Sequence, residues 1–125
     1  MVVLTYGSVW SQDVQVGSKK FTESVILGEL LAHLARDAGA AVEHRKELGG
    51  TRVLWGALLN GDIDAYAEYT GTISQEILAG ENVETAPAMR RALGAHRVMM
   101  TDPLGFNNTY AFGMNEADAE RLGIR

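Results

Sequence analysis

Short extended segments alternate with longer amphipathic segments along most of this chain, and this order constrains the fold more than any other feature. Strands that alternate with helices are typical of a mostly parallel sheet flanked by helices. We therefore predict the α/β class. The extended segments cover residues 13–21, 40–48 and 63–71, and the helical segments cover residues 22–39, 49–62, 72–80, 87–95 and 115–124.

The patterns inside these segments predict how they pack. Polar and apolar residues alternate in residues 40–48, which indicates an edge strand, because a central parallel strand would be apolar on both faces. Thr22 and Thr51 stand where helix N-caps are expected. The core-facing stripe expected for the first helix consists of Leu27, Leu30, Leu31, Leu34 and Ala38. One face of the third strand is expected to carry Ile63, Ala65, Ala67 and Tyr69.

The net charge and the composition of the chain exclude several classes of function. The chain has 125 residues, a net charge of −5 at pH 7 and no basic cluster longer than Arg90-Arg91, so a nucleic-acid partner is not expected. There is no cysteine, which excludes disulfides, thiol catalysis and thiolate metal sites. No apolar run approaches the ~18 residues of a membrane-spanning helix. Residues 1–13 are mildly apolar without a basic start, and we interpret them as a lead-in segment rather than a signal peptide.

Three loops follow the predicted strands, and ligands of open α/β sheets bind where such loops meet. Each loop combines small residues with a helix N-terminus, which attracts anions. Lys19 or Lys20 adds a positive charge there. Tyr69 adds an aromatic face, and a later segment adds Asn108 and Tyr110.

Anion-binding groups beside aromatic faces suggest a zwitterionic ligand. A quaternary ammonium has no N–H to donate, so tyrosine faces would hold it instead, each contributing roughly 0.5–2 kcal/mol. The carboxylate or hydroxyl end of the ligand would then meet Lys19, Thr72 and the helix N-termini.

Several of these features also have a purely structural interpretation. Gly49-Gly50-Thr51 alone is usually a turn with an N-cap, and Tyr66 is expected to pack against a covering helix. Trp55, Met99 and Met100 are expected in the core. The three histidines show neither metal-like spacing nor a catalytic partner, and the sequence contains no Ser-His-Asp, Walker or dinucleotide motif. We therefore predict no catalytic residue, no metal site and no cofactor.

Three segments resemble one known family. Residues 16–39 (VGSKKFTESVILGELLAHLARDAG), 48–72 (LGGTRVLWGALLNGDIDAYAEYTGT) and 104–112 (LGFNNTYAF) are similar to the substrate-binding proteins of osmoprotectant ABC importers, the glycine betaine, carnitine and choline class. The resemblance implies one lobe of a type II periplasmic binding protein fold. Because members of this family are much longer, residues 14–125 are expected to form the first lobe, without the second.

The resemblance also implies a ligand, partners and site residues. In this family, tyrosines of both lobes surround a quaternary ammonium such as glycine betaine, choline or carnitine. The lobes deliver it to an ABC permease in the membrane, so an extracytoplasmic location and no catalysis are expected. Carried over by position, the ligand-binding residues are Lys19, Tyr69, Thr72, Asn108 and Tyr110.

Two other functions stay open at this point. The chain could act as an isolated lobe, an interaction or sensory module that binds no osmolyte by itself. Porphobilinogen deaminase has related lobes, but the lack of cysteine and of an arginine-rich cleft argues against an enzyme lobe.

The resemblance leads to one expectation about assembly. In type II lobes, an antiparallel strand that returns from the second lobe fills a slot beside the third strand. We expect residues 109–114 to fill that slot here, either within the chain or in a strand-swapped homodimer, because open sheet edges recruit strands.

Overall fold

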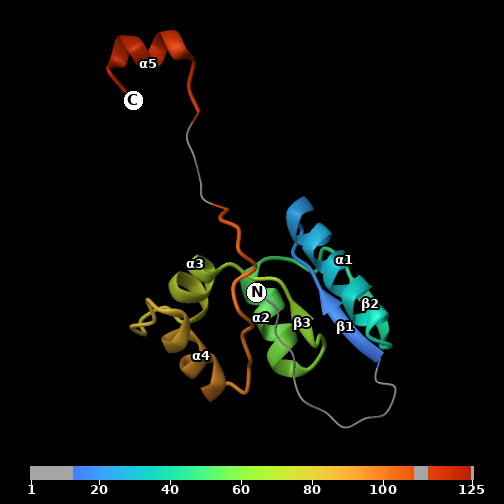
Figure 1. The fold of residues 1–125 in the computed structure, drawn as a ribbon. Helices are drawn as coiled ribbons and strands as arrows, with labels where there is room; N and C mark the ends of the chain where they lie inside the picture. The colour runs from blue at the N-terminus through green and yellow to red at the C-terminus, as the bar shows by residue number, and fades with distance from the viewer. Residues whose placement is uncertain (1–12, 109–112, 125) are drawn as a thin grey trace.

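A computed structural model of the chain describes residues 13–108 and 113–124. Within these ranges, three parallel strands form one sheet in the order β2-β1-β3 (Figure 1). The strands are β1 (Asp13–Gly17), β2 (Ala41–Arg45) and β3 (Ala65–Tyr66). The predicted α/β class is confirmed, and β2 lies at an edge of the sheet, as its alternating residues indicate.

The helices follow the strands in the predicted order. Their bounds are Thr22–Asp37 for α1, Thr51–Asn60 for α2, Thr70–Thr72 for α3, Ala86–Ala95 for α4 and Glu116–Leu122 for α5, with the π-helical turn η1 (Ile73–Ile77) directly after α3. In Figure 1, α5 lies apart from the sheet and the other helices. The strand predicted to fill the slot beside the third strand, within the chain or in a swapped dimer, comprises residues 109–114, and residues 109–112 lie outside the described part of the chain, so it stays a prediction.

Helices α1 and α2 cover opposite faces of β1, because successive strand residues point to opposite sides of a sheet. A Cβ at Gly17, the last residue of β1, would lie 2.9 Å from Leu54 of α2. The next residue, Ser18, lies beneath α1, where a Cβ at Gly28 would be 3.1 Å from the Ser18 Cβ. The loop after β1 therefore emerges between the two helices.

The predicted apolar stripe of α1 is wrong. Leu30 and Leu34 are 54% and 68% exposed, and the residues that α1 buries are Ser24, Gly28 and Ala32. These small residues allow the helix to approach the sheet closely. A Cβ at Gly28 would lie only 2.4 Å from the His44 ring, so a larger residue has no room there.

The two predicted threonine caps are also wrong. Thr22 and Thr51 are the first residues of α1 and α2, and the N-cap positions belong to Phe21 and Gly50, which make no side-chain cap hydrogen bond. Thr51 is instead used in the pocket described below. Asn115 is a true cap, since its side chain accepts a hydrogen bond from the Ala117 amide.

The third strand is shorter than predicted, and its two faces do not differ in burial. Only Ala65 and Tyr66 pair with β1, and four consecutive residues, 65–68, are buried. Burial on both faces is expected for a parallel strand covered by helices on each side. The main core gathers on the α2 side of the sheet and contains Leu54, Leu58, Ile63, Tyr66, Ile73, Leu78, Val83, Met89, Leu93, Val98 and Met100.

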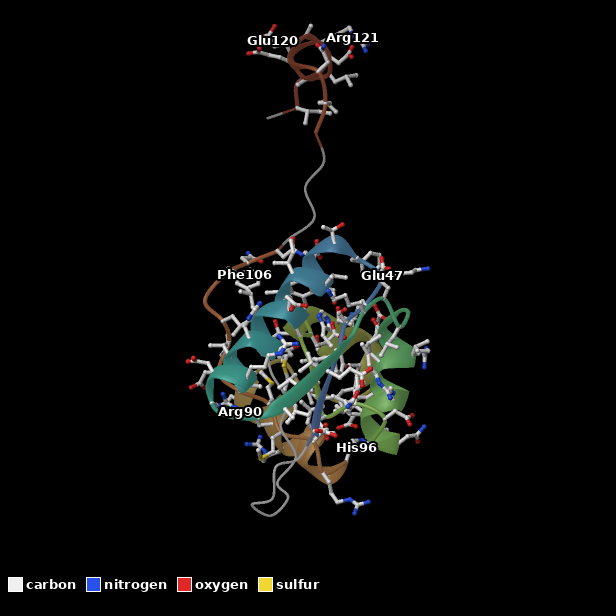
Figure 2. The ribbon with its side chains drawn as sticks, turned by 90° about the vertical axis from the view of Figure 1, so that its right-hand side faces the viewer. Glu47, Arg90, His96, Phe106, Glu120 and Arg121 are labelled. Atoms are coloured by element: carbon white, nitrogen blue, oxygen red, sulfur yellow. The ribbon has the colours of Figure 1, made fainter. Side chains whose placement is uncertain are left out.

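Residues 96–108 cross the body without forming a strand. Met100 is buried in the core and Trp55 packs against it, as predicted, whereas Met99 is 49% exposed. The Arg90 guanidinium donates to the carbonyl oxygens of Met100 and Thr101, and it pairs with the Asp102 carboxylate. This anchor fixes the start of a segment that runs along one side of the body to Phe106, near the beginning of α1 (Figure 2).

Candidate ligand-binding site

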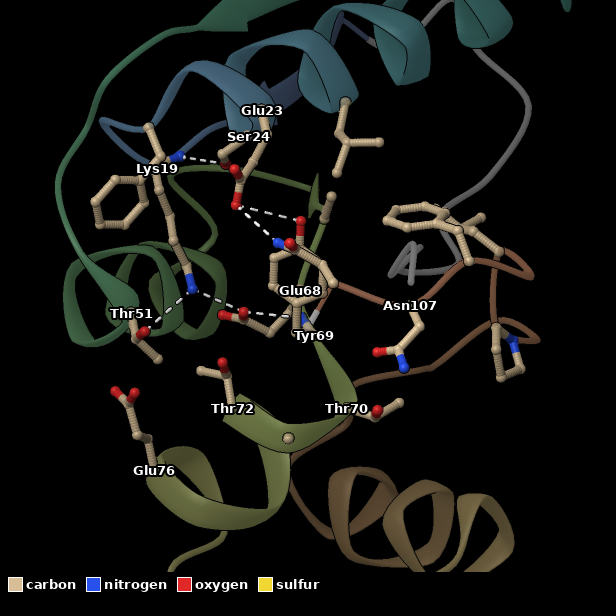
Figure 3. Close-up of a pocket in the computed structure, with 18 of the residues that line it drawn as sticks. Lys19, Glu23, Ser24, Thr51, Glu68, Tyr69, Thr70, Thr72, Glu76 and Asn107 are labelled. Carbon is tan, nitrogen blue, oxygen red and sulfur yellow. Dashed lines mark hydrogen bonds and ion pairs between the residues drawn. The ribbon is translucent and has the colours of Figure 1, made fainter. Parts of the chain in front are cut away.

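An open pocket of about 1080 Å³ lies where the loops after β1, β2 and β3 meet, at the carboxyl ends of the strands (Figure 3). Residues 103–108 form a further wall. Four of the five predicted site residues line this pocket, namely Lys19, Tyr69, Thr72 and Asn108. The fifth, Tyr110, lies outside the described residues.

Lys19 occupies the floor of the pocket and forms a buried ion pair. Its Nζ atom lies 2.7 Å from Glu68 Oε1 and donates to Thr51 Oγ1 at 3.1 Å. The two charged side chains are 8% and 0% exposed. The positive charge expected in this loop is therefore paired within the protein. Since an ammonium group has three N–H donors, one remains after these two contacts.

Glu68 also fixes the residue that follows it. Glu68 Oε1 accepts a hydrogen bond from the Tyr69 amide at 2.9 Å, in addition to the ion pair with Lys19. One carboxylate oxygen thus ties the loop after β1 to the end of the third strand. The sequence reasoning missed Glu68, although an acidic residue within a buried strand segment is itself a sign of a charged partner.

Tyr69 stands at the N-cap position of α3 and forms the aromatic wall of the pocket. Its ring meets Phe106 edge to face, with the ring centroids 6.5 Å apart and the planes at 88°. Its hydroxyl donates to Glu23 Oε1 at 3.3 Å. Desolvation, more than any other effect, raises the pKa of Tyr69, and the nearby Glu23 charge acts in the same direction. The phenol is therefore neutral at physiological pH.

Asn108 of segment 103–108 binds the same carboxylate oxygen as Tyr69 does. Its Nδ2 atom donates to Glu23 Oε1 at 3.1 Å, so Glu23 connects α1, the end of the third strand and segment 103–108 (Figure 3). Glu23 and Phe106 were missed from the sequence. Glu23 resembles a helix-dipole residue of the first turn, and Phe106 follows a glycine in an irregular segment.

Hydroxyl groups gather at the other end of the pocket. Thr72 of α3 and Thr51 of α2 lie there near Lys19, and Glu76 extends from η1 on the same side (Figure 3). The pocket therefore has an aromatic end and a polar end, which suits a small ligand with two different ends.

Other ionisable residues serve the structure. Tyr66 is buried in the core, as predicted, and burial raises the pKa of its hydroxyl far above the usual range, with Glu68 adding to the effect. His44 lies between Glu29 Oε2 at 2.8 Å and Ser18 Oγ at 2.9 Å. Hydrogen bonds from His44 and Lys46 lower the pKa of Glu29 to about 2.

The described residues contain neither a metal-binding cluster nor a membrane-spanning helix. Residues 13–108 and 113–124 contain no group of three histidine or acidic side chains arranged to hold a metal ion. Among the same residues, every helix is too short or too polar to cross a membrane.

Known proteins match this chain over most of its length. Residues 12–125 match the family described as the substrate binding domain of ABC-type glycine betaine transport system. The ergothioneine transport permease/ergothioneine binding protein EgtU of Helicobacter pylori is 32% identical over 87% of this chain and 20% of its own length. A glycine-betaine-binding protein of Pseudomonas aeruginosa is 33% identical over 95% of this chain and 39% of its own length.

A solved structure supports the same relationship. Apo YehZ from Escherichia coli matches with a TM-score of 0.59 and 29% identity, over 68% of this chain and 32% of that one. The chain thus spans between about a fifth and two fifths of the length of these relatives. It therefore belongs to the family of substrate-binding domains of ABC-type glycine betaine transport systems, and its sheet and helices form one lobe of the type II periplasmic binding protein fold.

Proposed function

We propose that the chain is a ligand-binding lobe of a substrate-binding protein that serves an osmolyte ABC importer, and that its pocket holds a quaternary ammonium osmolyte. Glycine betaine, choline and carnitine are the ligands we expect. The proposal includes an extracytoplasmic location, delivery to a membrane permease and no catalysis. The observation that carries it is the pairing of an aromatic end and a polar end in one pocket.

The aromatic end suits a trimethylammonium group. Such a group has no N–H donor, but the negative face of an aromatic ring attracts it. Tyr69 is neutral and held by hydrogen bonds through both its amide and its hydroxyl, so its ring is positioned before a ligand arrives. We propose Tyr110 as a second aromatic contact, from its position in the family motif.

The polar end suits a carboxylate or a hydroxyl. Lys19 has one N–H left for a ligand, and the Thr72 hydroxyl lines the same end of the pocket. Because Glu68 balances the lysine charge, a zwitterion fits this end better than a simple anion does. Asn108, which also lines the pocket, completes the proposed set of contacts.

The test is a titration of glycine betaine, choline and carnitine into the chain, followed by NMR chemical shifts. We expect shifts around Tyr69 and Thr72 and weak, millimolar affinity, because a cation at an exposed ring gains only about 0.5 kcal/mol. Tyr69→Leu should abolish binding, whereas Tyr69→Phe keeps the aromatic face and should retain most of it.

Either of two results would contradict the proposal. If none of the three compounds shifts resonances at the pocket, or if Tyr69→Leu binds as well as the wild type, the pocket does not hold a quaternary ammonium. Absence of any binding would favour the alternative, a lobe that binds no osmolyte by itself.

A further inference from the structure

We propose that Glu23 is a ligand-contacting carboxylate that faces the ammonium group and makes the pocket select for positive charge. This inference rests on the proposed function and adds a specificity residue to it.

Glu23 lies where three elements of the pocket meet. It projects from the first turn of α1 and accepts hydrogen bonds from the Tyr69 hydroxyl at 3.3 Å and from Asn108 Nδ2 at 3.1 Å (Figure 3). Within the described part of the chain, both bonds reach Oε1. The carboxylate is thus held in place, and its second oxygen is left for the pocket.

The other charged residues that line the pocket do not act at its aromatic end. Glu68 and Lys19 neutralise each other in the floor, and Glu76 lies on the side of the hydroxyl groups (Figure 3). Among the described residues that line the pocket, Glu23 is therefore the carboxylate next to the Tyr69–Phe106 pair.

A carboxylate beside aromatic rings changes what they select. Aromatic faces attract cations, but they also pack against uncharged apolar groups of the same shape. A trimethylammonium group and a tert-butyl group are close in size, so ring contact alone separates them weakly. A fixed negative charge at contact distance favours the cation alone, through a Coulomb attraction that needs no hydrogen bond.

The experiment compares charged and uncharged ligands of one shape. Choline, glycine betaine and 3,3-dimethyl-1-butanol, the uncharged carbon analogue of choline, are titrated by NMR into the wild type and into Glu23→Gln. The glutamine is nearly isosteric and can still accept both hydrogen bonds. Glu84→Gln, an exposed site outside the pocket lining, is the matched control.

We expect Glu23→Gln to weaken choline and glycine betaine by about fivefold each, the size of a contact between charges in a partly solvated pocket. The uncharged analogue should bind the two proteins equally, whether its affinity is measurable or below detection in both. Glu84→Gln should bind all three compounds as the wild type does.

Three results would overturn the inference. An unchanged choline affinity in Glu23→Gln means that the carboxylate does not contact the cation. A parallel loss for the uncharged analogue means that Glu23 only holds the wall in place. If the wild type binds neither choline nor glycine betaine, the proposed function fails first and this inference fails with it.

Discussion

Removing the charge of Glu68 while keeping its shape should destabilise the fold strongly. The Glu68 side chain is fully buried and Lys19 is 8% exposed, so Glu68→Gln leaves the lysine with little solvent to replace its partner. Breaking a buried ion pair at one end typically costs 3–5 kcal/mol. We expect about 3 kcal/mol here, the lower end, because the pocket is open and admits water to the lysine.

A change of Lys19, the other partner of the ion pair, completes a double-mutant cycle. Lys19→Met should cost a similar free energy of unfolding, since it leaves the Glu68 carboxylate buried without its cation. The double variant Lys19→Met/Glu68→Gln buries no unpaired charge. We therefore expect it to be more stable than either single variant, which corresponds to a coupling free energy above about 3 kcal/mol.

Urea unfolding at neutral pH, followed by the fluorescence of Trp55 and by circular dichroism, measures the free energy of unfolding of the wild type and the three variants. Trp55 packs against the core and reports on its loss. The reasoning is refuted if each single variant loses less than about 1 kcal/mol and the two losses add, because that is the behaviour of an exposed ion pair.

Three further predictions concern stability. Gly28→Ala should cost about 2 kcal/mol or more in a denaturant melt, because the new Cβ would lie 2.4 Å from the His44 ring; a neutral result would mean that α1 can move away from the sheet. The lowered pKa of Glu29 gives stability that is present above its ordinary pKa of 4.5 and is lost as the pH falls toward about 2. The advantage of the wild type over Glu29→Gln in denaturant midpoint should therefore shrink over that range, and a difference independent of pH would contradict it. Leu54→Ala, at a fully buried core position, should cost about 3 kcal/mol, and a loss below about 1 kcal/mol would show that the core collapses around the gap.

Much of the fold can be predicted from local patterns of residues in the sequence. Alternating residues identify the edge strand β2, and α2 (Thr51–Asn60), which ends at the left-handed Gly61, lies within the helical segment predicted for residues 49–62. The order of strands and helices then predicts the sheet type, because a parallel strand needs a crossover between neighbours. The same order predicts that Lys19, Tyr69 and Thr72 meet at one end of the sheet, and they do.

Local sequence patterns do not predict which side chains pack between a helix and the sheet. The leucines of α1 form a regular stripe in the sequence, yet the helix turns Ser24, Gly28 and Ala32 toward the sheet. Hydrophobic periodicity ranks side chains by apolar character, whereas the close approach of helix and sheet selects small ones. The His44 ring that fills the remaining space comes from another element, so the residue pattern of α1 alone does not contain both halves of this contact.

The features of the pocket also separate into those that the sequence predicts and those that only the folded structure decides. The sequence by itself determined the class of fold, the end of the sheet at which the pocket lies and the residue types gathered there, because these depend on order along the chain and on motif. The tertiary structure alone decided which charges are unpaired. The partners Lys19 and Glu68 are 49 positions apart, and Glu23 and Asn108 are 85 apart. A charge that the sequence offers is neutralised or left available by what lies within a few ångströms of it, and that distance exists only after the chain has folded.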